Sequence, residues 1–185
     1  MISTADFRNG MSIELEGDLY SIVEFQHHKP GKGGAVVRTK LKNFKTGAIM
    51  NKTFRAGEKV EQAIIEKEKK QYLYNSGDTY YFMDLQTYEQ VPLDVKLLGD
   101  SMKFLKENME IEILVHNASV IGAELPTFVD LKVTYTEPGL RGDRVSNASK
   151  PATLETGTQI QVPLFVEIGD LIRIDTRTGE YSQRA

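Results

Sequence analysis

The sequence contains no cysteine, and this absence removes several kinds of chemistry at once. Disulfide bonds, thiolate metal sites and cysteine nucleophiles are excluded, and a chain without cysteine is compatible with a reducing compartment. Apolar residues never form a run long enough to cross a membrane, and the first six residues lack the basic and apolar parts of a signal peptide. These features predict a cytoplasmic protein with no membrane partner.

Acidic residues are absent from one long stretch of the chain. No Asp or Glu lies between Glu24 and Glu58, although the net charge of the 185 residues is −3. The same stretch holds eight basic residues: Lys29, Lys32, Arg38, Lys40, Lys42, Lys45, Lys52 and Arg55. A basic patch of this kind suits RNA phosphates. A merely solvated basic face is the alternative, and charge alone leaves it open.

Helical patterns are scarce, and the apolar periodicity is mostly that of strands. Apolar and polar residues alternate over 110–115, 129–135 and 160–166. Hairpin turns are predicted at three sites: Gly17-Asp18, Asn75-Ser76-Gly77-Asp78 and Gly169-Asp170. Apart from these strands and hairpin turns, the sequence predicts only a short helix at 101–106 and a turn at 58–62. This pattern is typical of an all-β chain built from small barrels.

The chain is predicted to contain three domains. Residues 77–90 and 169–183 share a faint internal repeat, and the strand groups separate near Ile64 and Pro126. The charge also changes there, because residues 65–126 hold 11 acidic and 6 basic residues. We therefore predict domains over 1–64, 65–126 and 127–185. Domains of about 60 residues are only marginally stable alone, so we expect them to lean on one another.

One segment, Lys29-Pro30-Gly31-Lys32-Gly33-Gly34-Ala35, is the most informative for function. It lies between strands predicted over 20–26 and 36–41, which indicates a long hairpin with an exposed tip. Pro30 restricts one φ angle, and the three glycines leave no side chain around Lys32, so its ammonium group can enter a narrow site. A flexible glycine-rich turn with a solvated lysine is the simpler alternative. A phosphate-binding P-loop is excluded, because Gly33 follows Lys32 where Ser or Thr is needed and Gln26 stands at the first glycine position.

Two distant segments resemble bacterial elongation factor P. The first is Lys29–Ala35 together with Val36-Val37-Arg38-Thr39-Lys40-Leu41-Lys42-Asn43. The second runs from Lys150-Pro151-Ala152-Thr153-Leu154-Glu155-Thr156-Gly157 through Ile160-Gln161-Val162-Pro163-Leu164-Phe165-Val166-Glu167-Ile168-Gly169 to Gly179-Glu180-Tyr181. With the matching length, the resemblance covers essentially the whole chain.

This resemblance implies an all-β fold of three consecutive small barrels. The first would be an SH3-like (KOW) domain, the next two OB-fold domains, and the outline would be L-shaped like a tRNA. The implied function is a translation elongation factor that binds the 70S ribosome between the peptidyl and exit tRNA sites. There it would position the peptidyl-tRNA acceptor end, especially when prolyl, and promote peptide-bond formation at consecutive prolines. The factor would be a monomer without an active site of its own.

The resemblance also implies a set of functional residues. Contacts with tRNA and ribosomal RNA are expected from Lys29, Pro30, Gly31, Lys32, Gly33, Gly34, Arg38, Lys40 and Lys42. Lys32 is the expected site of a covalent extension, which requires a modifying enzyme; no other cofactor is predicted. The C-terminal residues expected to face the ribosome and messenger RNA are Gly142, Asp143, Arg144, Tyr181 and Arg184.

Two other function classes compete with this interpretation. A general RNA-binding module of cold-shock or transcription-elongation type would share the barrels and bind free single-stranded RNA, although the acidic middle of the chain argues against it. The sequence contains no recognisable catalytic motif that would support an enzymatic function. The three histidines have no carboxylate spacing typical of a metal site, so no metal is predicted.

Overall fold

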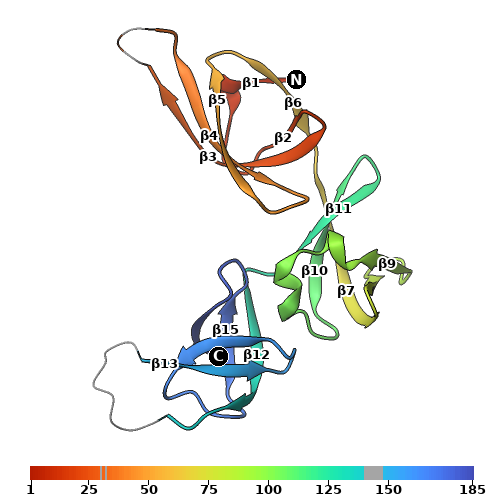
Figure 1. Cartoon of the computed structure of the whole chain (residues 1–185). Coiled ribbons are helices and arrows are strands. Elements are labelled where there is room, and N and C mark those ends of the chain that lie inside the picture. The colour runs from red at the N-terminus through yellow and green to blue at the C-terminus, as the bar shows by residue number, and fades with distance from the viewer. Residues whose placement is uncertain (30, 32, 140–147) are drawn as a thin grey trace. The chain divides into compact units, whose positions relative to one another are not determined.

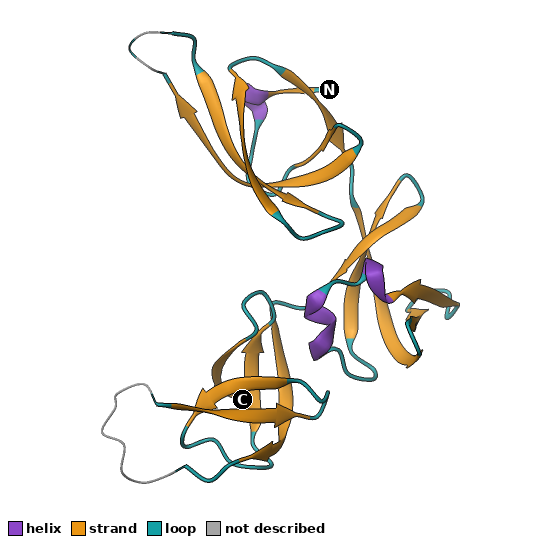
Figure 2. Ribbon diagram, in the orientation of Figure 1, coloured by secondary structure: helices purple, strands orange, loops and turns teal. Residues whose placement is uncertain are grey.

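The fold consists almost wholly of β-strands, which confirms the predicted all-β class. The computed structural model describes residues 1–29, 31, 33–139 and 148–185. Within those residues the regular structure is strand apart from three short 3-10 helices (Figure 2). No helix in the described ranges has the length and apolar character needed to span a lipid bilayer.

The strands of the described residues form three sheets. The first has the order β1-β6-β2-β3-β4-β5 and contains β1 (Ile2–Ser3), β2 (Ser12–Leu15), β3 (Asp18–His28), β4 (Val36–Asn43), β5 (Ile49–Arg55) and β6 (Lys59–Ala63). The second has the order β11-β10-β7-β8-β9 and contains β7 (Glu66–Ser76), β8 (Thr79–Asp84), β9 (Gln90–Asp94), β10 (Glu110–His116) and β11 (Ser119–Glu124). The third has the order β14-β13-β12-β15-β16 and contains β12 (Phe128–Thr136), β13 (Ser149–Leu154), β14 (Gln159–Pro163), β15 (Leu171–Asp175) and β16 (Glu180–Arg184). The 3-10 helices are η1 (Thr4–Asp6), η2 (Val95–Leu97) and η3 (Asp100–Phe104).

Residue contacts divide the chain into two compact units. The first unit comprises residues 1–68 and 113–122, and the second comprises residues 69–112 and 123–185. The third sheet and much of the second sheet therefore belong to one unit. The three domains proposed from the sequence, with boundaries after Ile64 and Pro126, stay a prediction.

In the first unit, β4 has one buried and one exposed side. Its buried side includes Val37, Thr39 and Leu41. Its exposed side carries the basic residues Arg38, Lys40 and Lys42. Because successive side chains of a strand point to opposite faces, packing of the core side places all three cations together on the outer side.

Strands β3 and β4 form one long hairpin, which confirms the predicted hairpin (Figure 1). Their pairing runs from Tyr20 opposite Asn43 to His28 opposite Val36. The segment 29–35 therefore connects the two strands at one end of the first sheet. Figure 1 shows β3 and β4 side by side toward this end.

A β-bulge interrupts the hairpin between Ile22 and Glu24. Ile22 is buried in the core of the first sheet, whereas Val23 is 44% exposed. Beyond the bulge, Phe25 packs against the same core, so Glu24 and Gln26 lie on the outer side. One extra residue shifts the alternation and exchanges the faces of all side chains that follow.

One five-residue turn recurs in all three sheets, between β4 and β5, between β8 and β9, and between β15 and β16. In each turn the first side chain accepts a bond from the backbone N–H two residues later, at 2.8 Å for Asn43, 2.8 Å for Asp84 and 2.9 Å for Asp175. In each turn the fifth residue has a left-handed φ, 70° at Gly47, 61° at Tyr88 and 74° at Gly179. The internal repeat in the sequence thus corresponds to a shared turn.

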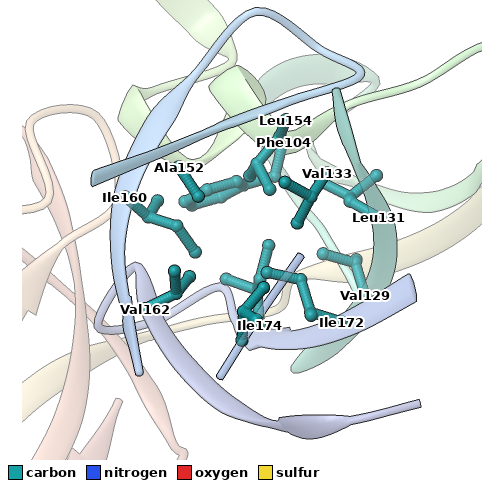
Figure 3. Close-up of a cluster of buried hydrophobic side chains, with 11 residues drawn as sticks. Phe104, Val129, Leu131, Val133, Ala152, Leu154, Ile160, Val162, Ile172 and Ile174 are labelled. Atoms are coloured by element: carbon teal, nitrogen blue, oxygen red, sulfur yellow. The ribbon is translucent and has the colours of Figure 1, made fainter. Parts of the chain in front are cut away.

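The third sheet encloses an apolar core of the second unit (Figure 3). The sheet and its connections supply Val129, Leu131, Val133, Ala152, Leu154, Ile160, Val162, Val166, Ile172 and Ile174. Phe104, from η3 between β9 and β10, is fully buried in the same cluster. Thr158 Oγ1 donates a hydrogen bond to the Lys103 carbonyl at 2.7 Å, beside this ring. Within this unit, η3 therefore packs against the third sheet.

Three local predictions were wrong or incomplete. Residues 58–62, predicted as a turn, fall mostly in β6, because β6 pairs with both β1 and β2. The helix predicted over 101–106 is the 3-10 helix η3 over Asp100–Phe104. Gly169-Asp170 does not close a hairpin, because the strands on either side of it, β14 and β15, are not neighbours in the third sheet. Gly169 N instead donates to the Val133 carbonyl of β12 at 2.8 Å.

Candidate nucleic-acid interface

The outer side of the first sheet brings residues from β3, β4 and β5 into register. One row across the three strands consists of Gln26, Arg38 and Thr53, and the next row consists of Glu24, Lys40 and Asn51. With Thr39 and Lys52, these residues line a groove of about 390 Å³. Two cations, Arg38 and Lys40, and one carboxylate face this groove, together with amide and hydroxyl groups that can donate hydrogen bonds. The ammonium group of Lys52 lies instead over the Phe54 ring and 3.4 Å from Glu16 Oε1. The arrangement therefore suits an anionic ligand such as an RNA phosphate.

Lys40, which was predicted to contact RNA, already has an anionic partner. Its Nζ lies 2.8 Å from Glu24 Oε2, and Gln26 Nε2 donates to Glu24 Oε1 at 3.2 Å. The hydrogen bond and the charge of Lys40 hold the pKa of the Glu24 carboxyl below its usual value. Glu24 therefore partly neutralises Lys40, and a phosphate that takes the place of the carboxylate on Nζ competes with Glu24.

Arg38 and Lys42 differ from Lys40 in this respect. Both are exposed on the same side of β4. Neither forms an ion pair with a carboxylate of residues 1–29, 31, 33–139 or 148–185. Arg38 and Lys42 can therefore meet a phosphate backbone without competition from a carboxylate of the described residues.

The hairpin tip is exposed where the structure describes it. Lys29, Gly31 and Gly33 are all solvent-exposed. Gly33 has a φ of 110°, which L side chains rarely adopt, whereas a Cβ added at Gly31 or Gly34 would meet nothing within 4 Å. At the base of the tip, Ala56 N donates to the Ala35 carbonyl at 2.9 Å. Pro30 and Lys32, predicted as the working residues of the tip, lie outside the described residues.

The C-terminal residues predicted to face the ribosome lie partly within the structure. Tyr181 and Arg184 are on β16, and the Tyr181 ring packs edge-on against Phe165 with 6.5 Å between centroids. Arg184 Nη2 lies 2.6 Å and 2.7 Å from the two carboxylate oxygens of Asp170. The hydrogen bond from Arg184 holds the pKa of Asp170 below its usual value. The other predicted residues of this group, Gly142, Asp143 and Arg144, lie outside the described ranges.

Two carboxylates of these sites were missed by sequence reasoning. Glu24 was seen only as the end of the acid-free stretch, and Asp170 only as part of a turn. A signal for Glu24 was available in the sequence. Along the chain, Glu24 precedes the hairpin tip by about as many residues as Lys40 follows it, which indicates that the two lie at the same level of the hairpin. Asp170 and Arg184 are 14 residues apart and meet only through the packing of the third sheet, which no local pattern indicates.

Comparison with known proteins places the chain in one family along its whole length. Three family models match: "Elongation factor P (EF-P) KOW-like domain" over residues 3–60, "Elongation factor P (EF-P) OB domain" over residues 65–123 and "Elongation factor P, C-terminal" over residues 129–184. Elongation factor P of Moorella thermoacetica is 60% identical over 185 residues, and that of Pelotomaculum thermopropionicum is 57% identical over 184 residues. Both alignments cover 100% of each chain.

A solved structure gives an independent likeness. The protein described as "Eukaryotic translation initiation factor 5A from Methanococcus jannaschii" matches with a TM-score of 0.52 and 27% sequence identity. The match covers 68% of this chain and 90% of that one. The family models over residues 3–60 and 65–123 confirm the predicted KOW-like and OB character of the fold. Family models and full-length relatives agree, and this chain belongs to the elongation factor P family of translation elongation factors.

Proposed function

We propose that this chain binds the 70S ribosome between the peptidyl and exit tRNA sites. There it promotes peptide-bond formation at consecutive prolines, by holding the acceptor end of the peptidyl tRNA, especially prolyl-tRNA, with the Lys32 loop. Membership of the elongation factor P family and the long β3–β4 hairpin support this proposal. The protein acts as a monomer in the cytoplasm, with the three domains 1–64, 65–126 and 127–185.

The observation that carries the proposal is the open space around the described part of the hairpin tip. Only Gly33 needs glycine for its backbone conformation. At Gly31 and Gly34 the chain itself leaves room for a side chain, yet the sequence has none. The protein's own packing would allow side chains at these two positions. Their absence therefore leaves room for the close approach of a partner, here the tRNA end beside Lys32.

The cations near the tip would orient this partner. Arg38 and Lys42 on the outer side of β4, and Lys29 at the end of β3, suit phosphates of tRNA or ribosomal RNA. Phosphate contacts fix register and orientation without reading sequence. That property fits a factor that acts on many different peptidyl tRNAs.

The proposed mechanism is positioning, and the bond-forming chemistry remains that of the ribosome. Proline is a constrained secondary amine and a poor nucleophile in this reaction, so correct alignment of the two reactants matters more than usual. Holding a reactant in a productive geometry lowers the entropic part of the barrier. The factor needs no cofactor and no active site of its own for this role.

A covalent extension on Lys32 would increase its reach. The unmodified side chain is limited to four methylene groups, and an added group would carry a donor or a cation further along the tRNA end. A modifying enzyme of the host would attach it. Peptide mass spectrometry of the protein from its native host should find added mass on the peptide that contains Lys32; unmodified Lys32 would contradict this part of the proposal.

The C-terminal residues complete the proposed contacts with the ribosome and messenger RNA. The contact group consists of Gly142, Asp143, Arg144, Tyr181 and Arg184. Because its guanidinium is bound to Asp170, Arg184 acts in this proposal by holding the connection that precedes β15, while Tyr181 lies beside Phe165.

The proposal is tested by Lys32→Ala in cells that depend on this factor. Synthesis of a reporter with a proline run should fall by roughly tenfold, which corresponds to about 1.4 kcal/mol on the barrier, and a proline-free reporter should be unaffected. Lys45→Ala is the matched control, because Lys45 is an exposed lysine in the turn between β4 and β5. An unchanged yield of the proline-run reporter with Lys32→Ala would refute the proposed role.

A further inference from the structure

Glu24 occupies an unusual place in the groove on the outer side of the first sheet. It is the one carboxylate among the described residues that line the groove. Both of its oxygens are engaged, one by Lys40 Nζ at 2.8 Å and the other by Gln26 Nε2 at 3.2 Å. The groove thus contains a negative charge where an anionic ligand would otherwise meet Lys40.

The Glu24–Lys40 pair is open to exchange. The side chain of Lys40 is 53% exposed and that of Glu24 is 43% exposed, so water and ions reach both. Exposed ion pairs contribute little net stability and are screened by salt. A phosphate oxygen can replace a carboxylate oxygen on an ammonium group, because both accept the same charge-assisted hydrogen bond.

We propose that this groove is a binding site for RNA phosphate in which Glu24 is a built-in competitor for Lys40. Arg38, in the neighbouring row without a carboxylate, is the main anchor of the phosphate. Glu24 reduces the contribution of Lys40 and so limits how tightly the groove holds RNA of any sequence. The inference rests on the proposed function, because it takes from it that this face meets RNA.

The consequence of this competition is selectivity. Contacts with phosphates do not distinguish one RNA from another, so a fully cationic groove would retain the protein on unrelated RNA. With Lys40 partly neutralised, a larger share of the binding free energy comes from the hairpin tip. Glu24 is therefore a specificity-determining residue rather than a structural one.

The test is RNA binding by the full chain carrying Glu24→Gln, which removes the charge and keeps the shape. The probes are a single-stranded RNA oligonucleotide and a deacylated tRNA, each titrated over a range of salt concentrations. The affinity for the oligonucleotide should increase up to about fivefold, the range of one exposed ion pair. The slope of log K against log salt should become more negative by about 0.7, as for one added phosphate contact on a single strand.

Two further variants separate a local effect from a change in net charge. Glu14→Gln alters the net charge equally but lies on β2, away from the described lining of the groove, and should leave the salt slope unchanged. The double variant with Glu24→Gln and Lys40→Gln should not show the gain in RNA affinity of Glu24→Gln alone, because Glu24 acts through Lys40.

The outcomes distinguish this inference from the function on which it rests. If Glu24→Gln binds RNA like the unaltered chain while Arg38→Gln binds more weakly, the competitor role is overturned and the RNA-binding face remains. If Arg38→Gln and Lys42→Gln also leave RNA binding unchanged, the inference and the RNA-binding part of the proposed function fail together. The proline-run assay of Lys32→Ala is independent of both.

Discussion

Phe104→Ala should destabilise the second compact unit by about 3–5 kcal/mol. The Phe104 ring is fully buried and packs in the core of the third sheet, although it comes from η3 between β9 and β10. Moving a fully buried phenyl ring to water costs about 1.5–3 kcal/mol. The cavity left behind adds about 24 cal/mol for each Å³ that the neighbours fail to fill. The cation–π contact of Lys103 Nζ, 5.2 Å from the ring centroid, is lost as well.

Hydrogen exchange in increasing urea measures this effect for the second unit separately. Amides of β12 and β15 should lose protection at lower urea in the variant than in the unaltered chain, because their inner residues contact the space left by the ring. Phe128→Ala is the matched control in the same sheet, since Phe128 is 47% exposed and should cost under about 1 kcal/mol. If the two variants lose the same small amount of stability, Phe104 is not part of this core and the reasoning is refuted.

Two further predictions concern acid stability and the repeated turn. The hydrogen bond from Arg177 lowers the pKa of Asp175 from 3.8 to about 2. The ionised Asp175 therefore stabilises the folded state fully above about pH 4, and this contribution is lost as the pH falls toward 2. Asp175→Asn should therefore weaken the pH dependence of unfolding between pH 4 and pH 2, as followed by tyrosine fluorescence. An unchanged titration curve would contradict the ion pair of Asp175 with Arg177. Gly47→Ala, at a φ of 70°, should lower the free energy of unfolding by about 1 kcal/mol in urea. Tyr88→Gly, at the equivalent position with a φ of 61°, should instead raise it by up to about 1 kcal/mol; destabilisation by both changes would show that the turns are not equivalent.

Features that depend on local chain geometry could be predicted from the sequence. The alternation of Val37 and Leu41 with Arg38 and Lys40 indicates both the strand and its basic side, because side chains of a strand alternate with a period of two. Pro30 and the glycines that follow it mark the hairpin tip in the same way. These signals, with the third-domain motif, were sufficient for the fold class and the family.

The partners of the charged residues were decided only by the tertiary structure. Without the bulge between Ile22 and Glu24, the pairing of Ile22 with Leu41 would continue as Glu24 opposite Thr39 on the core side. The extra residue places Glu24 opposite Lys40 instead, and so creates the ion pair in the groove. A single inserted residue has no reliable local signature, yet it exchanges the two faces of a strand.

The same distinction applies to the second unit. The sequence by itself determined which residues are apolar and which strands they form, because both follow from short-range patterns. Only the tertiary structure decided that Phe104 joins the core of the third sheet and that Arg184 is bound by Asp170. Those contacts join segments that are separate in the chain, and their free energy arises from packing that no single segment contains.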